Sequence, residues 1–414
     1  MASSKKLLVI GYVWPEPSSS AAGSRMIQLL EFFRDEGWQI TFASTAKETS
    51  HMAELEPFGF ETVPIKLNDQ GFDKFLRKLD PQMVLFDRFM AEEQFGWRVQ
   101  AGAPDAIRVL DMEDLHCLRY GRQQAVKGGQ PFSDDFLLSN IAKREIASVY
   151  RCDLSLVISE AEIELMAGFF GVPPALMHYF PFMLGPIDSR QVESWPSFDK
   201  RKGFMTIGNF RHEPNLDAVF YLKGEIWPLI RKSLPDAELR VYGAYATKKV
   251  KQWHSPDSGF LVNGRAEDAG TELSRARVSL APLRFGAGLK GKLAESMLFG
   301  TPSVTTTVGA EGIAGELPWP GSIADSPQEF ADAAIRLHNN KEAWNKAQHL
   351  GVGIIKRRFS PEVFRKSLSE RLQVIQENIE AHRRRNFTGA MLMHHSIAST
   401  RFMSRWIEEK NREK

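Results

Sequence analysis

The sequence predicts an α/β protein made of two doubly wound parallel sheets in series, each covered by helices. Short β-rich apolar runs alternate with longer stretches of helical periodicity. The alternation stops at a turn-rich segment, 181–202, and then starts again. We therefore expect one domain over 1–185, a second over 200–357, and helices over 358–414 that pack back on the first domain.

The first half supplies the pattern of the first sheet. Met26, Leu29, Leu30 and Phe33 recur at helical spacing and predict a helix over 23–36. A second helix is expected at 160–169. The apolar runs that predict strands are 7–12, 39–44, 83–86, 107–110 and 154–158.

The second half repeats the alternation. Strands are expected at 203–207, 239–242, 260–262, 278–281 and 303–306. Helices are expected at 217–232, 268–276, 289–299, 329–337, 341–356 and 361–385. Pro228 lies inside the first of these helices and should bend or split it.

Composition limits the class of protein. Of 414 residues, 43% are hydrophobic and 25% are charged, which excludes a disordered chain, a collagen and a disulfide scaffold. A net charge of +2 gives no support to nucleic-acid binding. The charge is uneven, because residues 356–414 hold 14 basic and 7 acidic side chains.

The cysteine count and the apolar runs indicate the cellular compartment. Only two cysteines occur, Cys117 and Cys152, which fits a reducing cytoplasm. No run reaches the roughly 18 apolar residues that a membrane span needs. The apolar run at 7–14 is interpreted as a buried strand rather than a signal segment, because Pro15 and Pro17 follow it at once.

The most informative segment is 282–302, which follows the expected strand 278–281. Gly286 and Gly288 let the backbone turn tightly and approach a ligand. The helix that follows offers unpaired amide groups and a partial positive charge, an arrangement that binds phosphate. Lys290 and Lys292 in its first turn oppose the helix dipole, and a bound anion would remove this conflict.

Helical spacing places Lys292, Glu295 and Phe299 on one face, whereas Leu293, Ala294 and Met297 should face the core. The Glu295 carboxylate lies one turn behind Lys292, where it could accept hydrogen bonds from a ribose diol. The alternative is an exposed lysine–glutamate pair worth a few tenths of a kcal/mol. Spacing alone leaves the two interpretations equal.

Residues 278–313, which end in Gly309-Ala310-Glu311-Gly312, resemble the donor-site signature of GT-B glycosyltransferases, and most closely the retaining glycosyltransferase family 4, or group 1. The resemblance extends over most of the chain. It includes the segments 21–25, 111–116, 207–215 and 235–243.

The resemblance implies two Rossmann-like domains that face a cleft, with a nucleoside-diphosphate sugar on the second and most of the acceptor on the first. The implied catalytic residues are His116, Lys292 and Arg211. The implied donor-binding residues are Gly23, Gly208, Asn209, Arg265, Gly286, Ala287, Gly288, Leu289, Lys290 and Glu295.

Three positions depart from the family pattern. Many relatives carry a glutamate where this chain has Ala287, an arginine where it has Asn209, and a lysine where it has Asn215. Arg211 is expected to substitute for the missing phosphate-binding charge, with more supplied by Lys290 and Lys292.

The resemblance also implies the kind of reaction. A hexose-type sugar would move from the nucleotide donor to a polysaccharide, glycolipid or related acceptor, with retention and without a protein nucleophile. Lysine, arginine and helix-terminal amides would stabilise the charge on the departing diphosphate. Asp111-Met112-Glu113 is a poor version of an Asp-x-Asp metal site, so we expect no metal and no cofactor.

Several alternatives stay open. The fold could serve a nucleotide-sugar epimerase or hydrolase, or an inactive scaffold. Arg25 and Arg119 are expected to be solvated, and Cys117 to be a buried thiol. Arg383-Arg384-Arg385, with Phe402, Met403, Trp406 and Ile407 downstream, could dock peripherally on an anionic membrane from the cytoplasmic side, or the terminal helix could simply pack on the first domain.

Overall fold

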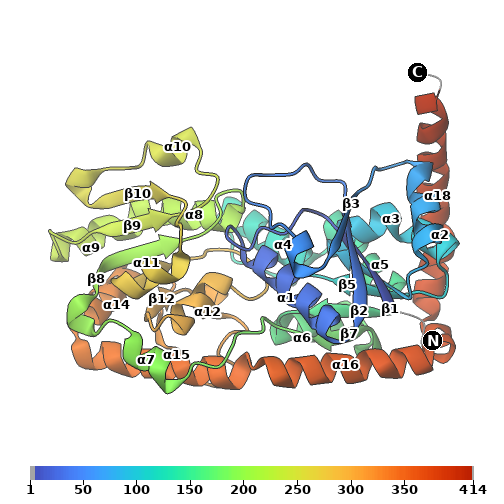
Figure 1. Cartoon of the computed structure of the whole chain (residues 1–414). Helices are drawn as coiled ribbons and strands as arrows, with labels where there is room; N and C mark the ends of the chain where they lie inside the picture. Colours follow the sequence, from blue (N-terminus) through green and yellow to red (C-terminus); the bar gives the residue numbers. More distant parts are fainter. Residues whose placement is uncertain (1–4, 413–414) are drawn as a thin grey trace.

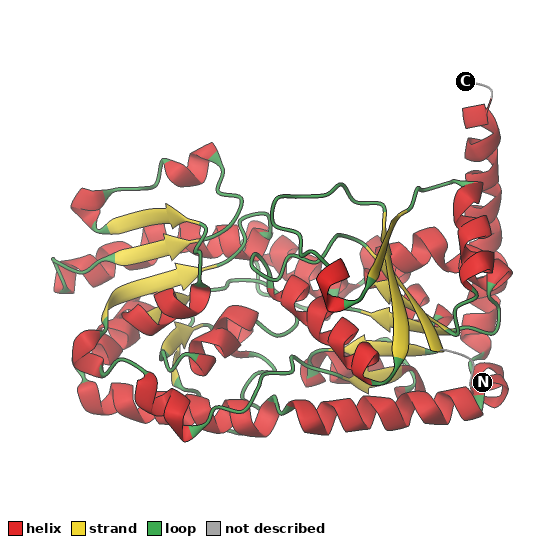
Figure 2. Ribbon diagram, viewed as in Figure 1, coloured by secondary structure: helices red, strands yellow, loops and turns green. Residues whose placement is uncertain are grey.

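The computed structural model describes residues 5–412, without the side chains of 395–398 and 411–412. Two α/β domains lie side by side, and long C-terminal helices run along one edge from the second domain to the first (Figure 1). Each domain is a strand layer between helices, as Figure 2 shows.

The first domain contains a seven-stranded parallel sheet with the order β3-β2-β1-β4-β5-β6-β7. Successive residues of its strands enter two different apolar clusters: Leu8 and Ile10 lie in one, Leu7 and Val9 in the other. Both faces are therefore buried, which explains why these strands are continuous apolar runs. The strands are β1 (Lys5–Gly11), β2 (Trp38–Ser44), β3 (Glu61–Pro64), β4 (Met83–Asp87), β5 (Ile107–Asp111), β6 (Leu154–Val157) and β7 (Met177–Tyr179).

Six helices belong to this sheet. The first, α1, begins after Ser20, whose hydroxyl accepts the Gly23 amide. The helices are α1 (Ala21–Asp35), α2 (Gln70–Leu79), α3 (Arg88–Gly102), α4 (His116–Lys127), α5 (Asn140–Arg151) and α6 (Glu160–Gly168).

The second domain contains a six-stranded parallel sheet with the order β10-β9-β8-β11-β12-β13. Its strands are β8 (Lys202–Ile207), β9 (Leu239–Tyr242), β10 (Phe260–Gly264), β11 (Ala276–Ala281), β12 (Ser303–Thr305) and β13 (Gly321–Ile323). Its helices are α8 (Glu213–Tyr221), α9 (Trp227–Ser233), α10 (Lys248–Lys251), α11 (Ala269–Arg275), α12 (Gly291–Leu298), α13 (Thr307–Ala310), α14 (Pro327–Asn339) and α15 (Lys341–Arg358).

The chain crosses between the domains twice. The first crossing contains α7 (Ser189–Ser194), and the second joins α15 to α16 (Pro361–Glu377). The two crossings touch, because the Leu184 amide donates to the Phe359 carbonyl at 3.0 Å. Leu368, Leu372 and Ile375 of α16 are buried in a first-domain cluster, so the C-terminal helices return to the first domain.

The last helices follow α16 along the first domain. They are α17 (Ile379–Arg385) and α18 (Phe387–Arg412). Arg98 of α3 donates to Ser404 of α18 at 3.1 Å and pairs with Glu408, so one face of α18 packs on the first domain. None of the helices in the described part of the chain combines the length and hydropathy of a membrane span.

The predicted fold class is confirmed, as are all the strands predicted from apolar runs. Pro228 does split its helix: a π-helical turn, Leu222–Ile226, separates α8 from α9. The single helix predicted over 361–385 is wrong, because it ends at Glu377 and resumes at Ile379. The short strands β3, β7 and β13 were missed, since each carries too few apolar residues for periodicity to appear.

Candidate active site

The two domains present the carboxyl ends of their strands to one another. Both sheets reverse their strand order once, between β1 and β4 in the first domain and between β8 and β11 in the second. Ligands of open α/β sheets bind at such switch points. The loops after these four strands therefore define the candidate site.

The glycine-rich loop after β11 is docked on the first domain. The Gly286 carbonyl accepts from Arg122 Nη1 at 2.9 Å, and the same guanidinium pairs with Glu311 at 2.7 Å. Ala287 is buried in a cluster whose other members all belong to the first domain. Leu289 is buried beside Ile158. Ala287 and Leu289 therefore serve packing between the domains in this structure.

Gly288 packs tightly against the first domain. Its φ of +62° lies in the left-handed region, and a Cβ there would come within 2.8 Å of Asp114 Cβ. Its amide donates to Glu162 Oε1 at 2.7 Å, and the same oxygen accepts the Leu115 amide at 2.9 Å. The amide expected to face a donor phosphate is thus held by a first-domain carboxylate.

The two lysines differ in their surroundings. Lys290 is 8% exposed, and its Nζ donates to the Gly288 carbonyl at 2.8 Å. Lys292 is half-buried, and its Nζ donates to Asn215 Oδ1 at 2.7 Å. Burial lowers the pKa of Lys290 and of Lys292 to about 8 in each case, so both ammonium groups are incompletely solvated.

Glu295 lies one turn after Lys292 on α12, half-buried. Burial raises its pKa to about 7, although Lys292 acts in the opposite direction. Among the described residues its carboxylate makes no hydrogen bond or ion pair within the usual distances. A desolvated carboxylate without a partner suits ligand hydroxyl groups better than a structural role. Leu293, Ala294 and Met297 are buried as predicted.

Asn209 and Asn215, two of the three positions that depart from the family pattern, form a hydrogen-bonded chain with Arg211. Asn215 Nδ2 donates to the Asn209 carbonyl at 3.0 Å, and Asn209 Oδ1 accepts the Arg211 amide at 2.8 Å. A Cβ on Gly208 would come within 2.8 Å of Lys292 Nζ. The glycine therefore leaves the space that Lys292 occupies, and the two asparagines fix the loop that carries Arg211.

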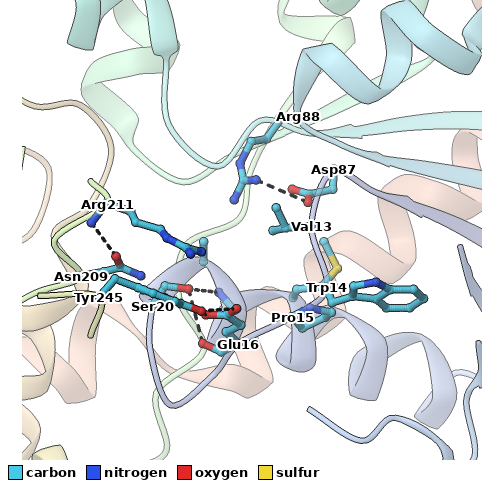
Figure 3. A pocket seen from close by; sticks show the side chains of 13 residues that line it. Val13, Trp14, Pro15, Glu16, Ser20, Asp87, Arg88, Asn209, Arg211 and Tyr245 are labelled. Carbon is cyan, nitrogen blue, oxygen red and sulfur yellow. Dashed lines mark hydrogen bonds and ion pairs between the residues drawn. The ribbon is translucent and has the colours of Figure 1, made fainter. Parts of the chain in front are cut away.

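A cavity of about 160 Å³ opens at the first-domain switch point, between the two domains. Gly23, Asn209 and Arg211 line it, so three of the predicted residues meet here. Figure 3 shows Arg88 of the first domain and Arg211 of the second pointing toward one another across it. The other lining residues are Val13, Trp14, Pro15, Glu16, Ser20, Ala22, Met26, Asp87 and Tyr245.

Gly23 is required by the loop that covers it. A Cβ there would lie 2.4 Å from the Glu16 backbone. The β1–α1 loop therefore packs directly on the first turn of α1, and the start of that helix faces the cavity. A close backbone approach was predicted at Gly23, and the structure shows one with protein rather than with a ligand.

His116 begins α4, and its ring Nδ1 lies 2.9 Å from the Asp114 carbonyl. The ring meets Phe89 edge-on at 5.4 Å between centroids. Glu145 accepts the amides of His116 and Cys117 at 2.9 and 2.8 Å, which fixes the start of the helix. The thiol of Cys117 is buried, as predicted.

Two expectations about arginines are wrong. Arg25 is 1% exposed and donates to Asp111 Oδ1 and to the carbonyls of Phe180 and Pro181. Arg119 is not free in solvent either, because it pairs with Asp114. The partners of Arg25 are distant along the chain, so its burial has no local signal, whereas Asp114 lies only five residues before Arg119 and the turn between them brings the two together.

Some residues fall outside the expected set. Arg265 is exposed on the loop after β10 and does not line the cavity, so its contact with a base stays a prediction. Arg88 and Glu162 were missed. Arg88 follows a buried strand end at Asp87, and that position was its one signal in the sequence. Its φ of +68° is visible only in the structure.

Comparisons with known proteins bear on the family pattern and on the fold. Residues 201–340 match the family model of "Glycosyl transferases group 1". No curated protein sequence is similar enough to count as a relative.

Solved structures are similar over most of the chain. Sucrose-phosphate synthase from Thermosynechococcus elongatus is 15% identical with a TM-score of 0.64, over 91% of this chain and 100% of that one. TarM of S. aureus is 10% identical with a TM-score of 0.67, over 89% and 99%. HepE of Anabaena, in complex with UDP and glucose, is 14% identical with a TM-score of 0.62, over 89% and 100%. The chain has the GT-B fold, and its second domain carries the group 1 glycosyltransferase pattern.

Proposed function

We propose that this protein is a glycosyltransferase that moves a hexose-type sugar from a nucleoside-diphosphate sugar to a saccharide or lipid-linked acceptor, with retention. The observation that carries the proposal is the second-domain switch point. Lys292 and Glu295 share one face of α12 there, Lys292 reaches Asn215 after β8, and burial shifts the pKa values of both. A lysine for phosphate and a carboxylate for a ribose diol match the adjacent diphosphate and ribose of such a donor.

The comparisons support the same reaction class. HepE is solved with UDP and glucose, and TarM with UDP and α-GlcNAc-glycerol. Both share the fold of this chain, and the 201–340 match covers the segment that carries Lys292 and Glu295. We propose that no metal is needed, because Lys290, Lys292 and Arg211 supply positive charge for the departing diphosphate.

The charge of the lysines explains how transfer would proceed. Negative charge builds on the departing diphosphate as the bond to the sugar breaks. The Lys292 ammonium is already desolvated and held by Asn215, so little reorganisation is needed to meet that charge. His116 would face the transferred sugar from the first domain, its ring orientation fixed by the Asp114 carbonyl.

The experiment is a thermal-shift screen with UDP-, GDP- and dTDP-sugars, followed by Lys292→Ala and Glu295→Ala. The correct nucleotide should raise the melting temperature, since ligand at 100 times its Kd adds about 2.7 kcal/mol. Each substitution should weaken nucleotide-sugar binding at least tenfold. Lys346→Ala and Glu342→Ala on α15 are matched exposed controls. Wild-type binding by both site variants would reject the assignment.

A second arm separates transfer from the other GT-B activities. The protein is incubated with the selected donor and no acceptor, and donor consumption is followed. A transferase should consume little donor, whereas an epimerase or hydrolase would turn it over completely. A protein that binds none of the nucleotides is a scaffold, and the proposal is then rejected.

We also propose that α18 holds the protein on an anionic membrane surface, on the cytoplasmic side, which suits a lipid-linked acceptor. Phe387, Met391, Phe402 and Trp406 fall on one helical face and are 47–76% exposed. The opposite face carries Ser404 and Glu408, which are held by Arg98. The nearby exposed bases that complement anionic lipid are Arg384, Arg385, Arg401, Arg405 and Lys410.

Co-sedimentation with vesicles tests this contact. Wild-type protein should sediment with vesicles containing phosphatidylglycerol and not with phosphatidylcholine alone. Phe402→Ser with Trp406→Ser should abolish sedimentation, whereas Phe220→Ser, an exposed phenylalanine on α8, should not. The membrane assignment would be overturned if the wild-type protein did not bind vesicles and instead formed a dimer, with a mass that halves in the double variant.

A further inference from the structure

The cavity at the first-domain switch point holds two arginines, Arg88 and Arg211, whose guanidinium groups keep hydrogen-bonding capacity for a ligand. Among the described residues, neither guanidinium donates a hydrogen bond, although each carries five N–H donors. The Arg88 guanidinium lies 3.6 Å from Asp87 Oδ2, and the Arg211 guanidinium lies over the Tyr245 ring at 3.5 Å from its centroid. Both side chains are directed into the same space (Figure 3).

The backbone of Arg88 is strained to place this side chain. Its φ of +68° is a left-handed conformation that costs a non-glycine residue about 1 kcal/mol or more. Asp87 ends β4 and accepts the Tyr12 amide at 3.0 Å, so the strand end itself is fixed. The Arg88 side chain is only 15% exposed. A turn of this kind at a strand end more often carries glycine, which would leave no side chain in the cavity.

The carboxylates around Arg88 do not cancel its charge. Asp111 is paired with Arg25, and Asp114 with Arg119. Burial and the neighbouring Asp111 raise the pKa of Glu113 to about 8, which disfavours its charged form. Asp87 is left as the single anionic neighbour that faces Arg88 without another cation, and burial raises its pKa as well.

Arg211 has no ion-pair partner among the described residues, and Glu16, the acidic side chain that also lines the cavity, makes its hydrogen bonds elsewhere. Glu16 is engaged by the Tyr245 hydroxyl at 2.7 Å and by the Thr49 hydroxyl at 2.5 Å. The first turn of the 15-residue helix α1 also faces the cavity, with Ser20, Ala22 and Gly23 in its lining. Its positive end adds to the two guanidinium groups.

We propose that Arg88 and Arg211 form a phosphate site that spans both domains. The inference rests on the proposed function for the source of the phosphate, which is the leaving diphosphate of the donor. Through Arg88 the first domain would help to hold that group. The two arginines would also supply the positive charge that is missing where the second domain has Asn209 and Asn215. An acceptor phosphate has the same chemistry, and the experiment separates the two sources.

The test begins with inorganic pyrophosphate, titrated by calorimetry against the full chain. Arg88→Gly removes the guanidinium, and its effects on stability oppose one another, because the backbone is relieved while buried Asp87 loses its ion-pair partner. Its melting temperature is therefore measured first, and affinities are compared at a temperature where the variant is folded. Its pyrophosphate affinity should fall about tenfold or more, and Arg211→Gln should lose as much. Arg88→Lys should keep part of the affinity. Arg144→Gln, which loses an exposed pair with Glu93, is the control and should bind normally.

UDP and uridine identify the source, with GDP and dTDP and their nucleosides as the alternative pairs. Weaker UDP binding with unchanged uridine binding in Arg88→Gly places the donor phosphate here. Unchanged UDP binding, with weaker glycerol 3-phosphate binding to the UDP-saturated protein, places an acceptor phosphate here instead. Arg88 variants that bind every probe like the wild type overturn the inference. If no nucleotide binds the wild type, the proposed function fails, while the pyrophosphate titration still tests the site.

Discussion

Two regions of the molecule have features that bind anions: the glycine loop after β11 and the cavity beside β1 and β4. The loop is covered by the first domain, whereas the cavity is open. The loop has the sequence pattern of a phosphate cradle, yet its Gly288 amide and its apolar residues are occupied by the first domain. The cavity has a weaker sequence signal, since Gly23, Asn209 and Arg211 were predicted but Arg88 was not. It is nevertheless open, and it is faced by two guanidinium groups that donate no hydrogen bond to the described residues. Sequence pattern marks where a ligand is expected to bind, whereas structure shows which polar groups are still free to bind it.

The difference also shows how the domains are held together. Glu162 Oε1 accepts the Gly288 amide as a phosphate oxygen would, and it does so although burial raises the pKa of Glu162 to about 8. The cavity is bridged instead by Tyr245 and Glu16 at its edge, which leaves the centre empty. We infer that the two regions respond differently when a ligand arrives, and three substitutions test this.

The largest expected effect comes from Arg25, which anchors the helix that forms one wall of the cavity. Arg25→Ala should lower the free energy of unfolding by about 3–5 kcal/mol, because Asp111 is left buried and unpaired. Arg34→Ala on the same helix, which breaks an exposed pair with Asp35, should cost less than about 0.5 kcal/mol. Urea denaturation measures both. Equal costs would show that the cavity wall does not depend on this anchor.

Substitution of Glu162 should produce the next largest loss of stability, and it should also raise the affinity for pyrophosphate. Glu162→Ala leaves the amides of Leu115 and Gly288 unpaired and should lower stability by about 1–3 kcal/mol. The freed Gly288 amide should then raise pyrophosphate affinity several-fold. Glu162→Gln keeps an oxygen for both amides and should resemble the wild type. An affinity that falls in Glu162→Ala would mean that Glu162 shapes the loop instead of competing with the ligand.

The smallest effect near neutral pH is a pH dependence that belongs to the loop lysines, and it grows as the pH rises above 8. Lys290 and Lys292 have pKa values lowered to about 8, and the ammonium form binds the anion. Above pH 8 the free protein must take up a proton in order to bind, so nucleoside-diphosphate affinity should fall up to about tenfold per pH unit for each lysine involved. Lys292→Arg should flatten the profile measured between pH 7 and 9.5. A flat wild-type profile would mean that the cavity arginines alone hold the ligand.

Much of the fold follows from local sequence, but only part of the candidate site does. Apolar runs such as 83–86 and 154–158 predict strands because they are buried on both faces, and Pro228 marks the helix break it causes. Lys292 and Glu295 were found from helical spacing, since both lie on one element. Arg88 could not be found in this way, because its importance depends on a backbone torsion and on a second domain more than a hundred residues further on. The burial of Arg25 depends on Phe180 and Pro181, which are equally distant.

The two interdomain crossings described above have a mechanical consequence. Leu184 and Phe359 join the two crossings by a hydrogen bond. The two segments that connect the domains would therefore act as adjacent pivots when the domains move. Two pivots that lie side by side would favour rotation of the domains about one axis that passes through both. A swing of this kind would separate Glu162 from Gly288 and Arg88 from Arg211 in one movement, so a substrate could enter and the charged groups could reassemble around it in register.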